Sequence, residues 1–458
     1  MINFAIEAEK YRKEFLMLLD QWISIPSIYN NETVSAMMPF GTDIAQALEW
    51  FKNKGEEEGF TTKLVDGYAA HIEYGKGEEY VYVFGHCDVV PAGQGWSGDP
   101  FKLLKSGDML VGRGVIDDKG PLLATFLALK LIRDKALPLK RKIRIVAGGN
   151  EENGFKCIRY YFQKEPKPTY GFTPDAKFPV INGEKGGMVL QISGKVENNR
   201  MFILGGEVHN TIPPYVTVSN CMIHKEKIGD YLKENQLTLE YSNAKNKVKG
   251  FTLFGLGGHS SKPEKANNPI EKVLQLLNME LQEKWLEDLT FLFAGNNRDG
   301  RIFGLGEKGR CGTLTMVPTI LRLEGGRLEL TLSVRYPENL DVEEILEKIA
   351  AFLKYKGIEG YELKVSSNKK PHYIETDSLL VRKLYQVYVK HTGDRENPVR
   401  VTSAGTYAAE MENAVVFGGE FPDGSAGNAH MANEYGSEDA FIKSIGIYAE
   451  ALWELANL

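Results

Sequence analysis

The 458-residue sequence contains few cysteines, and the four that it has stand far apart with no Cys-x-x-Cys pair. This spacing excludes a disulfide framework and a thiolate zinc site of the usual kinds, and reduced thiols are typical of a cytoplasmic protein. No apolar run approaches the roughly 20 residues needed to cross a bilayer. The N-terminus carries acidic residues early and lacks the pattern of a secretory signal. We therefore predict a cytoplasmic protein with no membrane partner.

Excess positive charge is also absent. The formal net charge is -6 and the isoelectric point is near 5.9, whereas a nucleic-acid-binding surface should be basic. No run of basic residues is interleaved with aromatics, so nucleic acid is not an expected partner. A composition of 43% hydrophobic and 25% charged residues is that of an ordinary globular protein, and 458 residues exceed what one core usually supports. Two domains, or three, are expected.

Apolar strand-like runs alternate with helical patterns in the first part of the chain. Tyr80–Phe84 is apolar on both faces, Lys142–Ala147 is a second apolar run, and helical periodicity covers residues 119–134 between them. Strands that alternate with helices in this way predict an α/β domain with a mostly parallel central sheet.

The pattern changes near residue 186 to strand-rich segments with separated helices, and the α/β style resumes near residue 375. We therefore predict one domain built from residues 1–185 and 375–458. Residues 186–374 should form an inserted α+β domain, composed of two α+β subdomains.

Side chains that bind metals stand in the loops after four likely strands. The carboxyl ends of strands are where ligands bind in an open α/β sheet, so these loops are expected to converge. Imidazoles and carboxylates without a thiolate suit zinc, with manganese or cobalt as substitutes. An acid-rich set of this kind can hold two ions about 3.5–4 Å apart. The residues are His86, Asp88, Glu151, Glu152, Asp175 and His430, and a further loop supplies Asp117 and Asp118.

Each of these features alone has an ordinary structural explanation. A His-x-Asp sequence is more often a surface pair, two aspartates can cap a helix, and a Glu-Glu pair is commonly a solvated helix start. Cys87, between His86 and Asp88, should face the core, because neighbours on an extended segment point to opposite faces. The coincidence of metal-type ligands at four strand ends favours the metal site.

Four motifs, in order along the chain, resemble the co-catalytic zinc peptidase family that includes peptidase V, carnosinase-type dipeptidases, aminoacylase and succinyl-diaminopimelate desuccinylase. The resemblance covers nearly the whole chain. It is greatest to peptidase V, through Gly95-Trp96, Asp99-Pro-Phe101, Phe172-Thr-Pro-Asp-Ala176 and Ile181-Asn-Gly-Glu184. The four motifs are Gly85-His-Cys-Asp-Val-Val-Pro91, Gly112-Arg-Gly-Val-Ile-Asp-Asp-Lys-Gly-Pro121, Gly149-Asn-Glu-Glu152 and Ala429-His-Met-Ala-Asn-Glu434.

The resemblance implies a role for each metal-type residue. Two zinc ions are expected, one held by His86 and Asp175, the other by Glu152 and His430, with Asp117 as the bridge. Asp88 would orient His86. Glu151 would be the general base that takes a proton from the attacking water, because this role needs a carboxylate that is near the metals and not bound to them.

The inserted domain resembles the lid of this family, and a segment after it resembles one that closes over the carboxyl end of the substrate. In the lid, His259 would polarise the scissile carbonyl, and Arg335 and Asn210 would hold the substrate carboxylate. The closing segment supplies Ser403, Gly405 and Thr406.

The predicted activity is metal-dependent hydrolysis of small dipeptides with an unblocked N-terminus. Two alternatives remain open: an amidohydrolase that removes an acyl group from an amino acid with the same site, and a non-catalytic protein that binds metals or peptides. The insertion, residues 186–374, is longer than the single small domain through which many relatives dimerise, so a monomer is expected.

Overall fold

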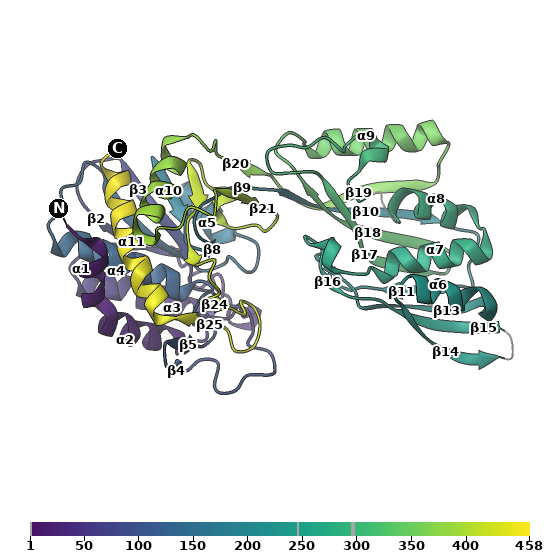
Figure 1. Cartoon of the computed structure of the whole chain (residues 1–458), viewed down its shortest axis with the longest axis horizontal. Coiled ribbons are helices and arrows are strands. Elements are labelled where there is room, and N and C mark those ends of the chain that lie inside the picture. Colours follow the sequence, from purple (N-terminus) through teal and green to yellow (C-terminus); the bar gives the residue numbers. More distant parts are fainter. Residues whose placement is uncertain (1, 245–246, 295–297) are drawn as a thin grey trace. The chain divides into compact units, whose positions relative to one another are not determined.

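The structure, a computed structural model, describes residues 2–244, 247–294 and 298–458. The chain divides into two compact units (Figure 1). The first unit comprises Met1–Gly183, Ile374–Val401 and Gly405–Leu458, and the second comprises Glu184–Tyr373 with Thr402–Ala404.

Residues 402–404 differ from the sequence prediction, which placed them in the segment that returns to the first domain. They group with the second unit. The backbone N–H of Lys185 donates a hydrogen bond to the carbonyl oxygen of Thr402 at 3.0 Å, which ties this short segment to the start of the second unit.

A nine-stranded sheet forms the centre of the first unit, in the order β1-β2-β6-β3-β7-β22-β9-β20, with β21 beside β9. The central strands β6, β3, β7 and β22 run parallel to their neighbours in this group, whereas β1–β2, β2–β6 and β22–β9 are antiparallel pairs. The predicted α/β fold is confirmed, with the parallel pairing confined to the middle of the sheet. The strands are β1 (Thr61–Val65), β2 (Ala69–Tyr74), β3 (Tyr80–His86), β6 (Lys142–Gly148), β7 (Tyr170–Thr173), β9 (Ile181–Glu184), β20 (His372–Tyr373), β21 (Arg400–Thr402) and β22 (Ala414–Val416).

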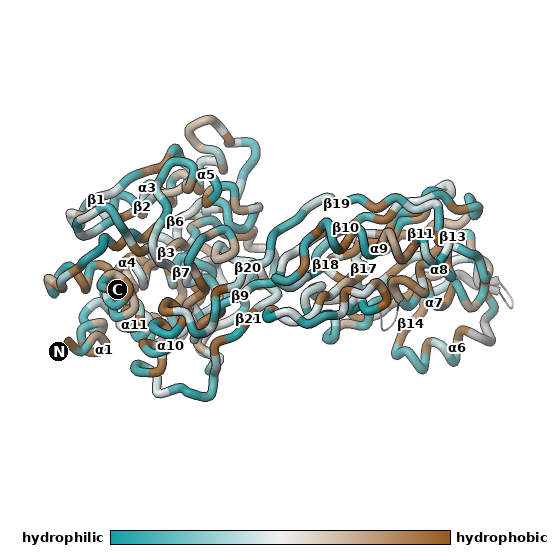
Figure 2. The backbone as a smooth tube through the Cα atoms, turned by 90° about the horizontal axis from the view of Figure 1, so that it is seen from above, coloured by the Kyte–Doolittle hydropathy of each residue, from teal (hydrophilic) through white to brown (hydrophobic). Residues whose placement is uncertain are grey.

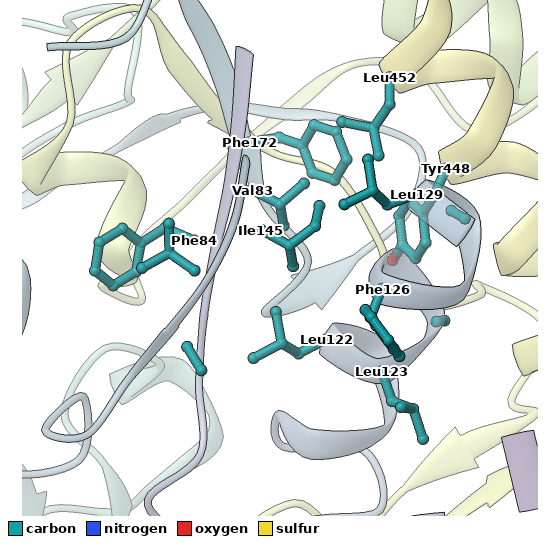
Figure 3. Packing of buried hydrophobic residues seen from close by; sticks show 14 of the residues in the cluster. Val83, Phe84, Leu122, Leu123, Phe126, Leu129, Ile145, Phe172, Tyr448 and Leu452 are labelled. Carbon is teal, nitrogen blue, oxygen red and sulfur yellow. The ribbon is translucent and has the colours of Figure 1, made fainter. Parts of the chain in front are cut away.

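Helices cover both faces of this sheet. Figure 3 shows Val83 and Ile145 on one face, packed against Phe126 and Leu129 of α4, while Phe84 points away from them. The ring of Phe84 packs at 5.3 Å from that of Tyr161 in α5, on the opposite face. The helices of this unit are α1 (Phe4–Ala8), α2 (Arg12–Ile23), α3 (Thr42–Glu57), α4 (Lys119–Asp134), α5 (Lys156–Lys164), α10 (Leu379–Thr392) and α11 (Glu438–Ala456).

Helix α4 is apolar around its whole circumference, because it lies between the sheet and α11. Its buried leucine and phenylalanine side chains contribute about 1.5–3 kcal/mol each by leaving water. This packing fixes the N-terminus of α4, which follows Asp117 and Asp118 directly.

Two small sheets complete the first unit. One joins a hairpin from the first part of the chain to a hairpin near its end, through antiparallel pairing of β5 with β25. This pairing places the loop before β25 beside the loop that precedes α4. The strands are β4 (Leu104–Ser106), β5 (Met109–Val111), β24 (Ala426–Gly427) and β25 (Tyr435–Ser437) in one sheet, and β8 (Ala176–Lys177) and β23 (Gly419–Glu420) in the other.

The second unit is built on an eight-stranded sheet in the order β14-β15-β13-β11-β17-β18-β10-β19. Hydrophobic and hydrophilic residues alternate along β18, as expected for a strand with one covered face (Figure 2). The sequence predicts two α+β subdomains here. In the structure β11 pairs with β17, so one continuous sheet runs through the unit, and the division into subdomains stays a prediction. The strands are β10 (Gly186–Lys195), β11 (Phe202–Gly205), β13 (Tyr215–His224), β14 (Thr238–Ala244), β15 (Lys247–Phe254), β17 (Thr315–Glu324), β18 (Arg327–Tyr336) and β19 (Tyr361–Lys369).

Four helices pack on this sheet, and a separate two-stranded pair, β12 (Thr211–Ile212) with β16 (Gly258–His259), stands beside it. Helix α9 shows how local sequence sets a boundary. The Asp341 carboxylate accepts the backbone N–H of Glu344 at its start, and Gly357 takes a positive φ of 64° at its end. The helices are α6 (Lys225–Glu234), α7 (Pro269–Leu281), α8 (Lys284–Phe293) and α9 (Val342–Lys356). None of the helices in the described residues of either unit is long and apolar enough to cross a membrane.

Candidate metal centre

Three neighbouring parallel strands deliver ligand-type side chains to one edge of the first unit's sheet. His86 is the last residue of β3, which lies between β6 and β7. Glu151 and Glu152 follow β6, and Asp175 follows β7. Because parallel strands present their carboxyl ends at the same edge, these side chains meet, as the sequence predicts.

Asp117 lies between two imidazoles. One of its carboxylate oxygens is 3.0 Å from Nε2 of His86, and the other is 2.9 Å from Nε2 of His430. A second carboxylate stands near each imidazole: Asp175 at 3.8 Å from His86, and Glu152 at 2.9 Å from His430. Each half of the site therefore has one imidazole, one carboxylate of its own and one oxygen of Asp117.

Ligand atoms in two overlapping groups lie within 4.8 Å of one another. One group is His86, Asp117 and Glu152, and the other is His86, Glu151 and Asp175. Either group could hold a cation, and because both include His86 they are alternatives for that imidazole; Glu151 is close enough to serve either as a ligand or as a base.

The electrostatics of the site fit a cation. Burial raises the pKa of Glu152 to about 7 and that of Asp175 to about 6, and it raises the pKa of Glu151 well above its usual range, with the charge of Asp175 adding to the effect. For Asp117, burial acts in the same direction, but hydrogen bonds from His430 and His86 lower its pKa overall. Carboxylates that repel one another in a buried site are best stabilised by divalent cations. The donor set, imidazole and carboxylate without thiolate, suits zinc or manganese.

Asp88 acts on both sides of the site. Nδ1 of His86 lies 2.9 Å from the main-chain oxygen of Asp88 and 3.6 Å from its carboxylate. The carbonyl can only accept, so Nδ1 carries a proton, and Nε2 is the nitrogen that faces Asp117 and would be the one to bind a metal. The Asp88 carboxylate itself accepts the backbone N–H groups of Glu151 and Glu152 at 3.1 and 3.2 Å. Asp88 thus orients His86 through its main chain and holds the two glutamates through its side chain.

Sequence reasoning missed a buried ion pair, Arg113–Glu434, which joins the loop before α4 to the loop that carries His430. Glu434 is completely buried, and one of its carboxylate oxygens accepts the backbone N–H groups of Gly114, Ile116 and Asp117 at 3.0, 2.9 and 3.2 Å. The other oxygen accepts from Nη1 of Arg113 at 2.7 Å. Glu434 belongs to the motif that begins at Ala429, so its loop also carries His430. The available signal in the sequence was an arginine near the start of the motif Gly112–Pro121 and a glutamate at the end of the motif Ala429–Glu434.

Two further polar groups at the start of α4, Asp118 and Lys119, are structural. The carboxylate of Asp118 accepts the backbone N–H of His86 at 3.2 Å. Nζ of Lys119 is fully buried and donates to the carbonyl oxygens of Trp22 and Ile25, at 3.0 and 2.7 Å. These bonds fix the loop against β3 and the end of α2. Cys87 is buried in the core, as predicted.

Three of the predicted lid residues are brought together within the second unit. His259 pairs with Thr211 across β16 and β12, and the backbone N–H of Ser260 donates to the carbonyl oxygen of Asn210 at 2.9 Å. The hydroxyls of Ser260 and Ser333 are 2.9 Å apart, and Ser333 stands two residues before Arg335 on β18. Asn210, His259 and Arg335 therefore share one end of this sheet.

The third group of predicted residues is divided between the units. Ser403 lies with the second unit, whereas Gly405 and Thr406 lie with the first. The Thr406 hydroxyl accepts the backbone N–H of Ala408 at 3.1 Å, as a cap of the short 3₁₀ turn that follows. The substrate-binding roles of all these residues stay predictions.

Comparison with known proteins decides the family. Residues 82–454 match the profile of Peptidase family M20/M25/M40. The chain belongs to this family. It is 32% identical over 480 residues to a Bacillus subtilis protein named "Putative dipeptidase YtjP", with 100% of both chains covered. It is 30% identical over 468 residues to a protein of Staphylococcus epidermidis named "Putative dipeptidase", and the alignment covers 97% of this chain and 98% of that protein.

Solved structures of this M20-family fold cover nearly the whole chain. Human carnosine dipeptidase 1 aligns with a TM-score of 0.57 at 16% identity, over 100% of this chain and 99% of that one. Aminoacylhistidine dipeptidase from Vibrio alginolyticus aligns with a TM-score of 0.57 at 14% identity, over 96% of each chain. These likenesses show the fold. The resemblance noted in the sequence is confirmed, and the M20-family chain is a hydrolase of the metallopeptidase class.

Proposed function

We propose that this M20-family protein is a dipeptidase that uses two zinc ions, with manganese or cobalt as possible substitutes. The observation that carries the proposal is the position of Asp117, whose two carboxylate oxygens each face an imidazole. His86 and Asp175 would hold one ion and His430 and Glu152 the other, with Asp117 between them. When bound, the ions supply Lewis-acid polarisation and lower the pKa of water.

Proton transfer and oxyanion stabilisation are assigned to residues of the chain. Glu151 removes a proton from the attacking water and delivers a proton to the leaving amine, because its carboxylate lies beside His86 and Asp175, which would hold one of the ions. Asp88 fixes the geometry of this step by holding the backbone N–H of Glu151. The proposal gives His259 the task of stabilising the developing oxyanion.

Substrate binding is assigned to the second unit and to the segment after it. Arg335 binds the C-terminal carboxylate of the peptide, because a guanidinium matches a carboxylate with two parallel hydrogen bonds. Asn210, Ser403, Gly405 and Thr406 complete the proposed binding set. The proposal retains a monomeric, cytoplasmic enzyme, and the four cysteines, which are buried and unpaired, are consistent with it.

A substrate panel tests the proposal against its alternatives. Unblocked dipeptides, a β-alanyl dipeptide, and N-acetyl and N-succinyl amino acids are offered to the protein with zinc and, separately, with a chelator. We expect hydrolysis of the unblocked dipeptides that the chelator abolishes. Hydrolysis of blocked amino acids alone would establish a deacylase, and the absence of any hydrolysis together with tight peptide binding would establish a binding protein.

A further inference from the structure

Two cationic side chains of the second unit lack an acidic partner. Arg335, on β18, is largely buried, and Lys185, just before β10, is half-buried. Among the described residues neither has an ion pair within 4 Å, and Nε of Arg335 is buried without a hydrogen-bond partner. Cations taken out of water without a counter-charge are costly, so these two side chains are suited to an anion supplied from outside.

The sheet places both cations on the same face. Gly187 of β10 lies directly opposite Arg335 of β18, and Lys185 stands two residues before Gly187. Lys185 lies between β9 and β10, two residues before Gly187, and two residues of extended chain span about 7 Å and return to the same side, which puts Lys185 about that far along the strand direction from the Gly187–Arg335 pair. A side chain at Gly187 would start 2.8 Å from Nη1 of Arg335, which shows that the guanidinium lies over this glycine.

Lys185 keeps hydrogen-bonding capacity for a ligand. Its Nζ donates to the carbonyl oxygen of Thr313 at 2.6 Å, which uses one of three N–H groups. Burial lowers the pKa of Lys185, and the charge of Arg335 acts in the same direction. Burial also lowers the pKa of Arg335. Each cation is therefore less stable in its protonated form than an exposed one, and a bound anion would relieve both.

A third cation on the same face is already neutralised. Lys369 of β19 also lies opposite Gly187, and its Nζ is 3.2 Å from the carboxylate of Glu184, whose side chain is buried. The Glu184 charge also acts favourably on Arg335. Lys369 thus has a carboxylate within ion-pair distance, whereas Lys185 and Arg335 have none among the residues that the structure describes.

We propose that Lys185 is a specificity-determining residue that selects dipeptides with an acidic C-terminal residue. Arg335 binds the C-terminal carboxylate and Lys185 binds the side-chain carboxylate of aspartate or glutamate. The inference rests on the proposed dipeptidase function. Two carboxylates on one residue match two cations that stand on one face of the sheet, about 7 Å apart along the strand direction, whereas a neutral C-terminal residue leaves Lys185 without an anionic partner.

Kinetics on an isosteric pair of substrates test this assignment. Values of kcat/KM for Gly-Glu and Gly-Gln are measured for the wild type, for Lys185→Met and for the control Lys348→Met, which breaks an exposed pair with Glu344 on α9. The wild type should prefer Gly-Glu by about tenfold or more, the ratio for one desolvated charge pair. In Lys185→Met the preference should fall to about one through loss of Gly-Glu turnover, with Gly-Gln turnover within about twofold of the wild type.

The control and a binding measurement keep the two proposals separate. Lys348→Met should retain the preference for Gly-Glu, and retained turnover of Gly-Gln shows that a variant is folded. The inference is overturned if the wild type shows no preference, or if Lys185→Met loses both substrates equally. If no dipeptide is cleaved, the dipeptidase proposal fails, and the binding of Gly-Glu to the metal-depleted protein is measured by calorimetric titration. Weaker binding by Lys185→Met than by the wild type would support the role of Lys185. Unchanged binding would overturn that role.

Discussion

Replacing Glu434 by glutamine should destabilise the first unit strongly, although the two side chains have nearly the same shape. The change removes a carboxylate that accepts three backbone N–H groups and Nη1 of Arg113. The amide can still accept through its oxygen, but its NH2 group then faces a donor. Arg113 is left as a buried cation, since its side chain is only 1% exposed. Removing one partner of a buried pair costs about 3–5 kcal/mol, and we expect a loss of this size in the free energy of unfolding.

Urea unfolding of the metal-free protein, followed by far-ultraviolet circular dichroism, measures this loss. The matched control is Glu412→Gln, which breaks the exposed pair with Lys167 and should change the free energy of unfolding by less than about 0.5 kcal/mol. Arg113→Met in the Glu434→Gln background should recover part of the loss, because no charge is then buried alone. A loss below about 1 kcal/mol, or strictly additive effects in the double variant, would refute the reasoning.

Two further predictions concern His71 and Asp88. Burial, with a contribution from the charge of Arg144, lowers the pKa of His71 to about 3, and the imidazole also faces Glu73, Lys63, Lys142 and the hydroxyl of Tyr161. The folded state therefore holds this histidine neutral, while the unfolded state takes up a proton below pH 6.5. The contribution of His71 to the free energy of unfolding is fully present above pH 6.5. It falls by about 1.4 kcal/mol per pH unit between pH 6 and 4. Urea titrations of His71→Gln should lack this slope, whereas the exposed control His224→Gln should retain it; equal slopes in the wild type and His71→Gln contradict the assignment. Asp88→Asn should weaken metal binding by about 10- to 100-fold, measured in competition with a chelating dye. The reason is that one of the two oxygen acceptors that hold the backbone N–H groups of Glu151 and Glu152 is lost. An unchanged metal affinity would show that the main chain alone holds these glutamates.

The elements of the first unit could be predicted from sequence because local pattern and tertiary environment agree there. The strand predicted at Tyr80–Phe84 is β3, apolar on both faces because helices cover both sides, and the helix predicted over residues 119–134 has the bounds of α4. The metal-type residues could be grouped because each follows a strand. The rule that ligands bind at the carboxyl ends of strands in an α/β sheet predicts that these side chains meet, without any distance between their atoms being known.

The second unit was harder to predict from sequence. Strand β19 alternates apolar and polar residues over residues 361–366, but none of its residues is fully buried, because it lies at the edge of the sheet. Strand β13 carries the exposed, polar pair Ser219 and Asn220 in its middle, where the pairing with β15 shifts register. Tertiary pairing decides such strands, and hydrophobic pattern alone does not reveal them. The pairing of β11 with β17, which makes one sheet of the unit, was hidden for the same reason.

The role of Glu434 could not be read from sequence because its partners are mostly backbone N–H groups, which every loop has. Only the fold shows that Gly114, Ile116 and Asp117 turn these groups toward one carboxylate. The positions of Lys185 and Arg335 on one face likewise depend on strand register, which is set by the whole sheet.

We propose different tasks for two adjacent glutamates, Glu152 as a metal ligand and Glu151 as the base. The direct measurement is metal content per chain by mass spectrometry, together with dipeptide turnover, for Glu151→Gln and Glu152→Gln. We predict that Glu151→Gln keeps the metal content of the wild type and loses turnover by about 10²- to 10⁴-fold, while Glu152→Gln binds less metal. Equal loss of metal in both variants, or full turnover in Glu151→Gln, would contradict the claim.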